Sequence, residues 1–149
     1  MPGASHAPFA VLTQTTKRSV PLIYGSQEEP LLRAISFFEK DTIPFNKYTR
    51  APFYKKLLAL RSITPALAAN ANYKKLVSSA DDKVFAYTRT AGKSKVLVVL
   101  NLSSMPQNIT IADATIIGDV KELFSDAKST LKADQSFSLP AWGYQLYSY

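Results

Sequence analysis

Cysteine is absent from the 149-residue sequence, and histidine occurs once, as His6. The absence of cysteine excludes disulfide bridges, thiolate metal sites and thiol nucleophiles. A single histidine excludes histidine-based zinc clusters, and a Ser-His-Asp triad could be built only on His6. We therefore expect neither a metal site nor a cofactor.

Long hydrophobic runs are missing as well. The longest, residues 96–100, has the size of a strand, whereas a membrane span needs about 18 apolar residues. Residues 1–10 also lack the charged region and the apolar stretch of a signal peptide. The sequence predicts a soluble protein with no membrane partner, and it encodes no compartment.

The charge is unbalanced, because 18 Lys and Arg face 11 Asp and Glu and give a net charge of +7. The basic doublets are nevertheless isolated along the chain: Lys17-Arg18, Lys55-Lys56 and Lys74-Lys75. No dense basic run or RNA-binding aromatic signature accompanies them. We expect a solvated basic surface and no nucleic-acid partner.

The length sets a further limit. A complete (β/α)₈ barrel needs about 200 residues, which this chain of 149 residues does not have. Hydrophobic residues nevertheless make up 46% of the sequence, enough for a real core. The pattern changes near residue 65, where helical and irregular segments give way to short alternating ones.

The part before residue 65 predicts a helix, a strand, a loop and a second helix. Residues 7–16 read as the end of a helix, with Phe9, Val11 and Leu12 as its buried side chains. Residues 19–25 are a short apolar run closed by glycine, typical of a strand buried on both faces of a parallel sheet.

Residues 31–51 predict a long loop with one helical turn at 31–35. In residues 52–63 a stripe containing Leu57 and Leu60 has helical spacing. Pro65 should end that helix, since a residue before proline is disfavoured in helical geometry.

The part after residue 65 predicts a compact antiparallel β domain. Lys83 to Thr90 and Lys95 to Leu102 should form a hairpin whose second strand is apolar on both faces and therefore central. The other expected strands are 73–77, 108–111, 120–124, 136–139 and 142–149. We predict a mainly β fold: a Greek-key β-sandwich preceded by an α/β piece.

Aromatic side chains in the last expected strand could stack on sugars. Trp142 and Tyr144 lie two residues apart and should share a strand face with Leu146. Aromatics at this spacing are more often part of a core face, so packing and sugar stacking both stay open.

Paired carboxylates are the other candidates for chemistry. Glu28-Glu29 and Asp81-Asp82 are adjacent pairs, and neighbours on an extended chain point to opposite faces. Asp81-Asp82 is most simply a turn. Glu28 follows the expected buried strand at the end where α/β folds bind ligands, although it could equally anchor a loop.

Three motifs occur together in order: Val20-Pro21-Leu22-Ile23-Tyr24-Gly25-Ser26-Gln27-Glu28-Glu29, then Phe37-Phe38-Glu39-Lys40-Asp41, then a helix beginning Ala51-Pro52-Phe53-Tyr54. Together with Pro65-Ala66-Leu67, they resemble the α-amylase family of glycoside hydrolases. In that family the first motif is the eighth barrel strand, and Ser26 stands where the family has glycine. A C-terminal antiparallel β domain then ends the chain.

The resemblance implies that residues 1–67 are the end of a TIM barrel and residues 68–149 a C-terminal β-sandwich. Tyr24, Gln27 and Glu28 would border the substrate site. The family's catalytic carboxylates lie on earlier strands, so no catalytic residue is assigned to this chain, which alone should be inactive.

The parent enzyme would cleave α-glucans such as starch and maltooligosaccharides with retention, and it could be secreted or periplasmic. Its N-terminal barrel would be the main partner of this chain. Apolar faces in residues 1–50 would be exposed without that barrel, or buried in an oligomer. The alternative function is a standalone carbohydrate-binding or scaffold module.

Overall fold

The computed structural model describes residues 3–149. Two helices, α1 (His6–Thr15) and α2 (Ala51–Ile63), and the 3-10 turn η1 (Pro65–Leu67) precede the strands. The strands are β1 (Asn72–Leu76), β2 (Val84–Ala91), β3 (Ser94–Asn101), β4 (Gln107–Ala112), β5 (Gly118–Glu122), β6 (Lys128–Leu131), β7 (Asp134–Leu139) and β8 (Tyr144–Ser148), with the 3-10 turn η2 (Ala114–Ile116) before β5. The fold is mainly β, as the sequence predicts.

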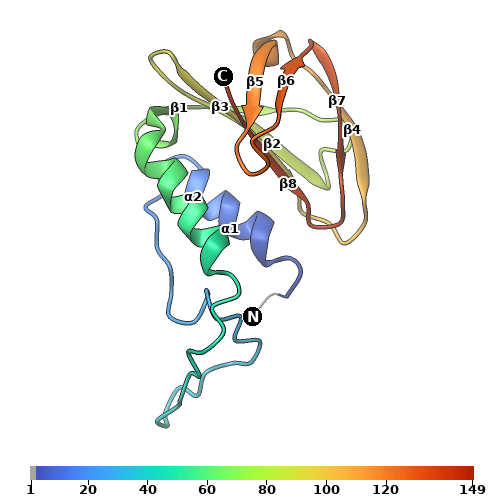
Figure 1. The fold of residues 1–149 in the computed structure, drawn as a ribbon. Helices are drawn as coiled ribbons and strands as arrows, with labels where there is room; N and C mark the ends of the chain where they lie inside the picture. Colours follow the sequence, from blue (N-terminus) through green and yellow to red (C-terminus); the bar gives the residue numbers. More distant parts are fainter. Residues whose placement is uncertain (1–2) are drawn as a thin grey trace.

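The strands form two antiparallel sheets (Figure 1). The larger has the order β1-β2-β3-β8-β5-β6, and β4 pairs with β7 in the smaller. After β3 the chain crosses to the small sheet as β4, returns to the large sheet as β5 and β6, crosses again as β7 and ends in β8, which pairs with both β3 and β5. The long connection from β3 to its neighbour β8 is of the kind that Greek-key sandwiches use.

The first apolar core fills the space between the sheets. Leu97 and Val99 of β3 face Ile109 of β4 and Phe137 of β7 within one buried cluster. Tyr147 of β8 belongs to this core. The sequence assigned the core face of the last strand to Leu146 instead, and that assignment is incomplete because both faces of β8 are covered.

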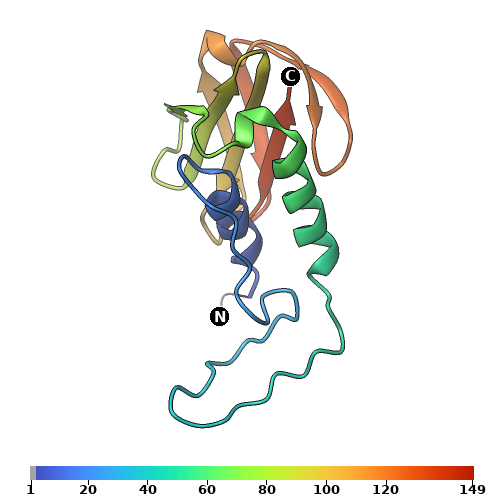
Figure 2. The ribbon, with the colours of Figure 1, turned by 90° about the vertical axis from the view of Figure 1, so that its left-hand side faces the viewer.

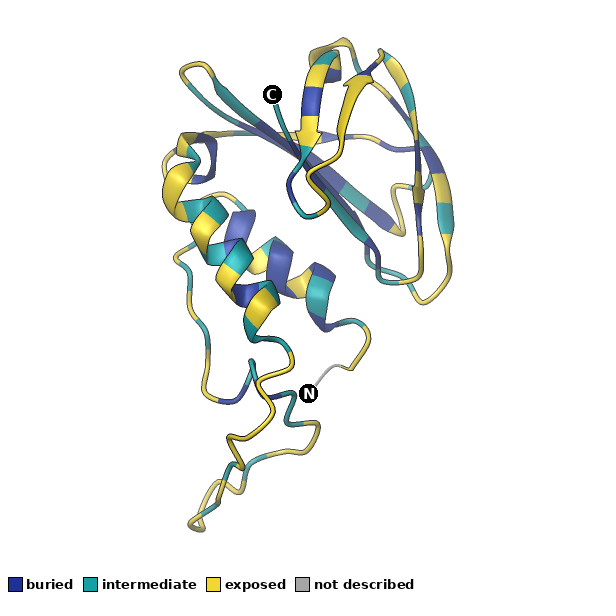
Figure 3. Cartoon of the chain, in the orientation of Figure 1, coloured by how far each residue is buried: buried dark blue, intermediate teal, exposed yellow. Residues whose placement is uncertain are grey.

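The second apolar core lies on the outer face of the large sheet, under the two helices. Val96, Val98 and Leu100 of β3 pack in one cluster with Val11 of α1 and Leu57 of α2. Strand β3 is therefore buried on both faces (Figure 3), which confirms its expected central position. The cluster joins residues from both sides of the expected boundary at residue 67.

Helix α2 confirms the sequence prediction in its position and its end. Pro52 occupies the first turn, where a missing N–H costs nothing. Thr64 is extended (φ −108°, ψ 102°), as the following proline requires. No helix among residues 3–149 is long and apolar enough to cross a membrane.

Helix α1 buries its apolar side chains less completely than predicted. Val11 is fully buried and Leu12 partly buried against the second core, but Phe9 is 42% exposed. The buried positions also include the polar Gln14 and Thr15, which face the second core and the chain that follows the helix.

The expected strand at residues 19–25 is wrong: this segment is irregular, and Val20, Leu22 and Tyr24 are 79%, 72% and 62% exposed. A parallel strand needs neighbouring strands to take its backbone groups, and none of the described residues supplies one here. The helical turn expected at residues 31–35 is also absent. Residues 19–50 extend away from the sandwich (Figure 2).

Two strand predictions need correction. Strand β6 was not expected, because its Lys-Ser-Thr-Leu sequence has one buried apolar residue, Leu131. The last strand begins at Tyr144, and Trp142 lies before it in a turn with φ of 56°. Trp142 and Tyr144 therefore do not share a strand face.

Candidate functional site

The three expected rim residues lie in a tight turn after the extended segment. The Tyr24 N–H donates to Gln27 Oε1 at 3.0 Å, and the Gln27 N–H donates to the Tyr24 carbonyl at 3.1 Å. Ser26, between them, has φ of 72°, a conformation that glycine adopts without strain. The structure thus keeps the backbone shape of a glycine-containing turn with serine in its place.

The carboxylate that anchors this region belongs to Glu29 rather than to Glu28. Glu29 accepts hydrogen bonds from the Lys47 N–H at 2.9 Å and the Tyr48 N–H at 2.6 Å. Burial would raise the pKa of Glu29, but these backbone donors outweigh it and lower the pKa. Glu29 therefore ties the turn to the end of the long excursion.

Glu28 contributes through both its backbone and its side chain. Its carbonyl accepts from the Arg50 N–H at 3.1 Å, just before α2. Its Oε2 atom is buried without a hydrogen-bond partner among the described residues. The structure places this carboxylate beside the first turn of α2.

A small cavity of about 140 Å³ lies between the turn, the side of α1 from His6 to Gln14, and Tyr54 near the start of α2. Gln27 lines it, together with His6 and Gln14 of α1 and Tyr54 of α2. The Oε1 atom of Gln14 is buried and has no hydrogen-bond partner within residues 3–149, while its Nε2 donates to the Leu22 carbonyl at 3.2 Å. The cavity thus brings Gln27 together with polar groups that the sequence did not single out.

The single histidine is part of this cavity wall. His6 Nε2 and the Tyr54 hydroxyl lie 2.8 Å apart and are hydrogen-bonded. Burial lowers the pKa of His6, and the charge of Arg50 lowers it further. Burial raises the pKa of Tyr54. These shifts keep both groups neutral near neutral pH, which suits a hydrogen bond between α1 and α2.

Arg89 was missed as a functional candidate. Its side chain on β2 is fully buried and donates to the carbonyls of Thr15 at 2.6 Å, Thr16 at 2.8 Å and Ala68 at 2.6 Å. Two weaker bonds reach Ala71 and Asn72 at 3.3 Å. Its place on the same face of β2 as Tyr87 was the sequence signal for an inward position.

Arg61 connects the helices in a similar way. Its guanidinium, on the last turn of α2, donates to the carbonyl of Gln14, and to the carbonyl and hydroxyl of Ser19. The two arginines fix the end of α1, and with it the start of the segment that leads to Tyr24.

The predicted sugar-stacking pair is separated in the structure. Tyr144 lies half-buried against Phe124 (ring centroids 5.0 Å apart) and Phe53 (5.7 Å). Trp142 lies 6.4 Å from Phe9. An open groove of about 420 Å³ runs beside Tyr144 and Phe124, without a wall from Trp142.

The described residues also show no metal centre: among residues 3–149, no three His, Asp or Glu side chains gather in a way that could hold an ion. The adjacent acids Asp81 and Asp82 follow β1 in a turn, where Asp81 pairs with Lys75. The turn interpretation of this pair is confirmed.

Comparison with known proteins finds a family match for the β domain. Residues 75–146 match the family model of the maltogenic amylase C-terminal domain. No curated protein matches the chain significantly.

Solved structures share the fold over nearly the whole chain. A noncanonic maltogenic α-amylase of Thermotoga neapolitana is 20% identical, with a TM-score of 0.82 over 98% of this chain and 36% of that enzyme. A cyclomaltodextrin glucanotransferase is 22% identical, with a TM-score of 0.72 over 97% of this chain and 31% of that enzyme.

AmyP, solved with bound maltose, is 14% identical, with a TM-score of 0.72 over 97% of this chain and 34% of its own. The chain therefore spans about a third of the length of these proteins. Residues 75–146 thus match the maltogenic amylase C-terminal domain model, and residues 3–149 share the fold of the corresponding parts of these solved amylase structures.

Proposed function

We propose that this chain is the non-catalytic C-terminal part of an enzyme that hydrolyses α-glucans such as starch and maltooligosaccharides. Residues 1–67 would complete a catalytic barrel, and residues 68–149 would brace it. The two carboxylates that such a retaining hydrolysis needs would come from the rest of the barrel.

The observation that carries the proposal is the apolar cluster between the helices and the large sheet. Val11 of α1 and Leu57 of α2 are fully buried against β3. A sandwich that covers these helix faces would fix their position in a barrel.

The exposed apolar side chains of the segment between the helices support the proposal that a barrel covers this part of the chain. Val20, Leu22 and Tyr24 expose large side chains in an extended backbone that neighbouring barrel strands would cover. In this arrangement Tyr24, Gln27 and Glu28 would border the substrate site without reacting. Sugar contact by Trp142 and Tyr144 stays a prediction.

The first test is hydrolysis by the purified chain. Soluble starch and maltoheptaose should yield no reducing ends above a blank. Hydrolysis that co-purifies with the chain would overturn the assignment as a non-catalytic part.

The second test supplies a barrel. In a chimera, this chain replaces the matching part of the Thermotoga neapolitana enzyme, and maltooligosaccharide hydrolysis is compared with that of the truncated enzyme. We expect activity only in the chimera. A folded, monomeric chimera without activity would contradict the bracing role. If the chimera does not fold, co-purification of the chain with the separately expressed barrel part decides the question, since bracing requires a stable complex.

A further inference from the structure

The long excursion between α1 and α2 exposes aromatic side chains to an unusual degree. Phe37 and Phe38 are 90% and 93% exposed, with their rings edge to face at 4.9 Å. A second pair, Phe45 and Tyr48, is stacked at 6.1 Å and about half exposed. Adjacent exposed aromatics of this size usually mark a contact surface.

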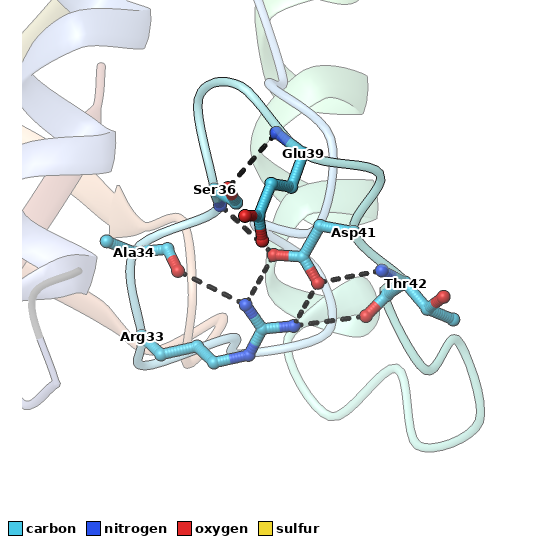
Figure 4. A network of polar contacts seen from close by, with 6 residues as sticks. All are labelled: Arg33, Ala34, Ser36, Glu39, Asp41 and Thr42. Carbon is cyan, nitrogen blue, oxygen red and sulfur yellow. Dashed lines mark hydrogen bonds and ion pairs between the residues drawn. The ribbon is translucent and has the colours of Figure 1, made fainter.

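The loop that presents Phe37 and Phe38 has a defined internal structure (Figure 4). The Arg33 guanidinium forms a two-pronged ion pair with Asp41, at 2.5 and 2.7 Å. Arg33 also donates to the Thr42 carbonyl at 3.1 Å, and Asp41 accepts from the Ser36 N–H at 3.2 Å. These bonds close the base of the loop and leave the two phenylalanines at its tip.

The ion pair also shapes the charge of the loop. The hydrogen bonds from Arg33 hold the pKa of Asp41 well below its usual range, so the pair stays ionised and mutually neutralised near neutral pH. Glu39 and Lys40 carry opposite charges beside the tip. The loop therefore offers apolar rings without a net charge, which suits an uncharged ligand.

A pyranose ring fits this chemistry. Its faces carry C–H groups that pack on aromatic rings, while its edge hydroxyls need hydrogen-bonding partners such as nearby charged side chains. Residues 33–42 follow the Tyr24–Glu29 turn, which in the proposed barrel would border the face where such barrels bind their ligands.

We infer that Phe37 and Phe38 form an aromatic platform for glucosyl units of an α-glucan chain. This inference rests on the proposed function, because it takes the excursion to lie at the mouth of a glucan-hydrolysing barrel. It adds a binding element carried by the present chain itself, at residues distinct from Tyr24, Gln27 and Glu28.

The test is a titration of the full chain with maltoheptaose, in which the NMR signals of the phenylalanine ring protons are monitored. Phe37 and Phe38 resonances should shift, and the double variant Phe37→Ala, Phe38→Ala should weaken binding roughly tenfold, as loss of aromatic contacts predicts. Ile117→Ala, which removes an exposed apolar side chain from the sandwich, is the matched control and should bind as the parent chain does.

The dependence of binding on salt concentration and on the glycosidic linkage of the ligand distinguishes this platform from other binding surfaces. Binding should change less than about twofold between roughly 50 and 500 mM NaCl, because no charge is neutralised. Cellohexaose, whose β-linked chain is straighter, should bind more weakly. Steep loss of binding with salt would overturn the inference in favour of an electrostatic site.

Arg33→Met tests the base of the loop. It should weaken maltoheptaose binding in the same direction as the double variant while leaving the unfolding midpoint of the sandwich unchanged. Equal binding by this variant and the parent chain would contradict a role for the closed loop.

Two outcomes overturn the platform outright. One is the absence of any phenylalanine shift with maltoheptaose, which would favour contact of the tip with the rest of the barrel. The other is equal binding by the double variant, which would place the sugar elsewhere. In the chimera, hydrolysis with an unchanged KM in the double variant would reject the platform and leave the proposed function standing.

Discussion

At the residue scale, Arg89 shows how a buried charge can be satisfied without a carboxylate. Its guanidinium reaches five backbone carbonyls, two of them at the C-terminal end of α1. Carbonyls at a helix C-terminus lack partners within the helix and carry partial negative charge. One side chain of β2 thereby ties the sheet both to α1 and to the link before β1.

Replacing Arg89 with methionine should destabilise the chain by about 3 kcal/mol, because the carbonyls of Thr15, Thr16 and Ala68 would lose their buried donor. Urea unfolding followed by circular dichroism measures the change. Lys93→Met, on the exposed turn between β2 and β3, is the control and should stay within about 0.5 kcal/mol. Similar changes in the free energy of unfolding for the two substitutions would show that the Arg89 hydrogen bonds do not stabilise the fold as described.

Ser26 is the second residue with an unusual environment. Its φ is 72°, and its buried hydroxyl has no hydrogen-bond partner among the described residues. Both features cost free energy in the folded state.

Ser26→Gly should therefore stabilise the chain by about 1 kcal/mol, after allowance for the greater freedom of glycine in the unfolded chain. Thermal unfolding and amide exchange at Gln27 and Glu29 measure the global and local effects. Ser104→Gly, in an exposed loop without positive φ, should be neutral or destabilising. A lower unfolding temperature for Ser26→Gly would contradict the conformational argument.

At the scale of elements, α1 and α2 are joined by the His6–Tyr54 hydrogen bond beside a small cavity. The pKa of His6 is lowered by burial and by Arg50, so the unfolded chain takes up a proton more readily than the folded chain. The stabilisation from neutral His6 is therefore full above the unfolded pKa of about 6.5 and is lost as pH falls through the lower folded pKa.

We expect the unfolding free energy to fall by less than about 1 kcal/mol between pH 7 and pH 5, since solvent screens part of the effect. In His6→Gln, whose side chain does not titrate, this part of the pH dependence should disappear. Urea unfolding at several pH values checks the slope. An identical slope in both proteins would assign the pH dependence to other groups.

How far the elements could be predicted depended on where their partners lie. Helix α2 and strand β3 carry their signals locally, in apolar spacing and in Pro65, and both were placed correctly. Residues 19–25 have the sequence of a buried strand, but strand formation depends on neighbours that the described residues do not provide. Strand β6 was missed because its pairing with β5, rather than its own sequence, fixes it.

The candidate site was less predictable for the same reason. The turn containing Tyr24 and Gln27 follows from a local motif, whereas the cavity that Gln27 lines together with His6 and Tyr54 depends on helix packing. The pairing of Glu29 with backbone groups 18 and 19 residues away has no local signal. Arg89 shows the same limit, because its partners lie in two segments, residues 15–16 and 68–72, that are distant from it in the sequence.

At the scale of the whole molecule, three layers follow one another: the helices, the six-stranded sheet and the two-stranded sheet (Figure 1). From the sequence, the apolar faces of residues 1–50 were expected to be exposed in the absence of a barrel. That expectation is wrong for α1, where Val11 is fully buried on the sheet, but residues 20–48 do expose large side chains.

Amide exchange should therefore divide the N-terminal part in two. Residues 10–15 of α1 should exchange as slowly as the outer strands, because their N–H groups are bonded within the helix. Most amides of residues 20–48 should exchange at least about a hundredfold faster than those of β3. Mass spectrometry of peptides from the two regions measures this, and uniform protection of residues 3–50 in a monomer would contradict the layer description.

The position of Trp142 gives the protein a built-in optical reporter. Tryptophan occurs once in the sequence, and its indole sits where the turn before β8 meets Phe9 of α1. Separation of the helices from the sheet would break the Trp142–Phe9 contact and expose the indole to water before the strands separate. Emission wavelength alone can thus distinguish detachment of the helical layer from melting of the sandwich, without any added dye.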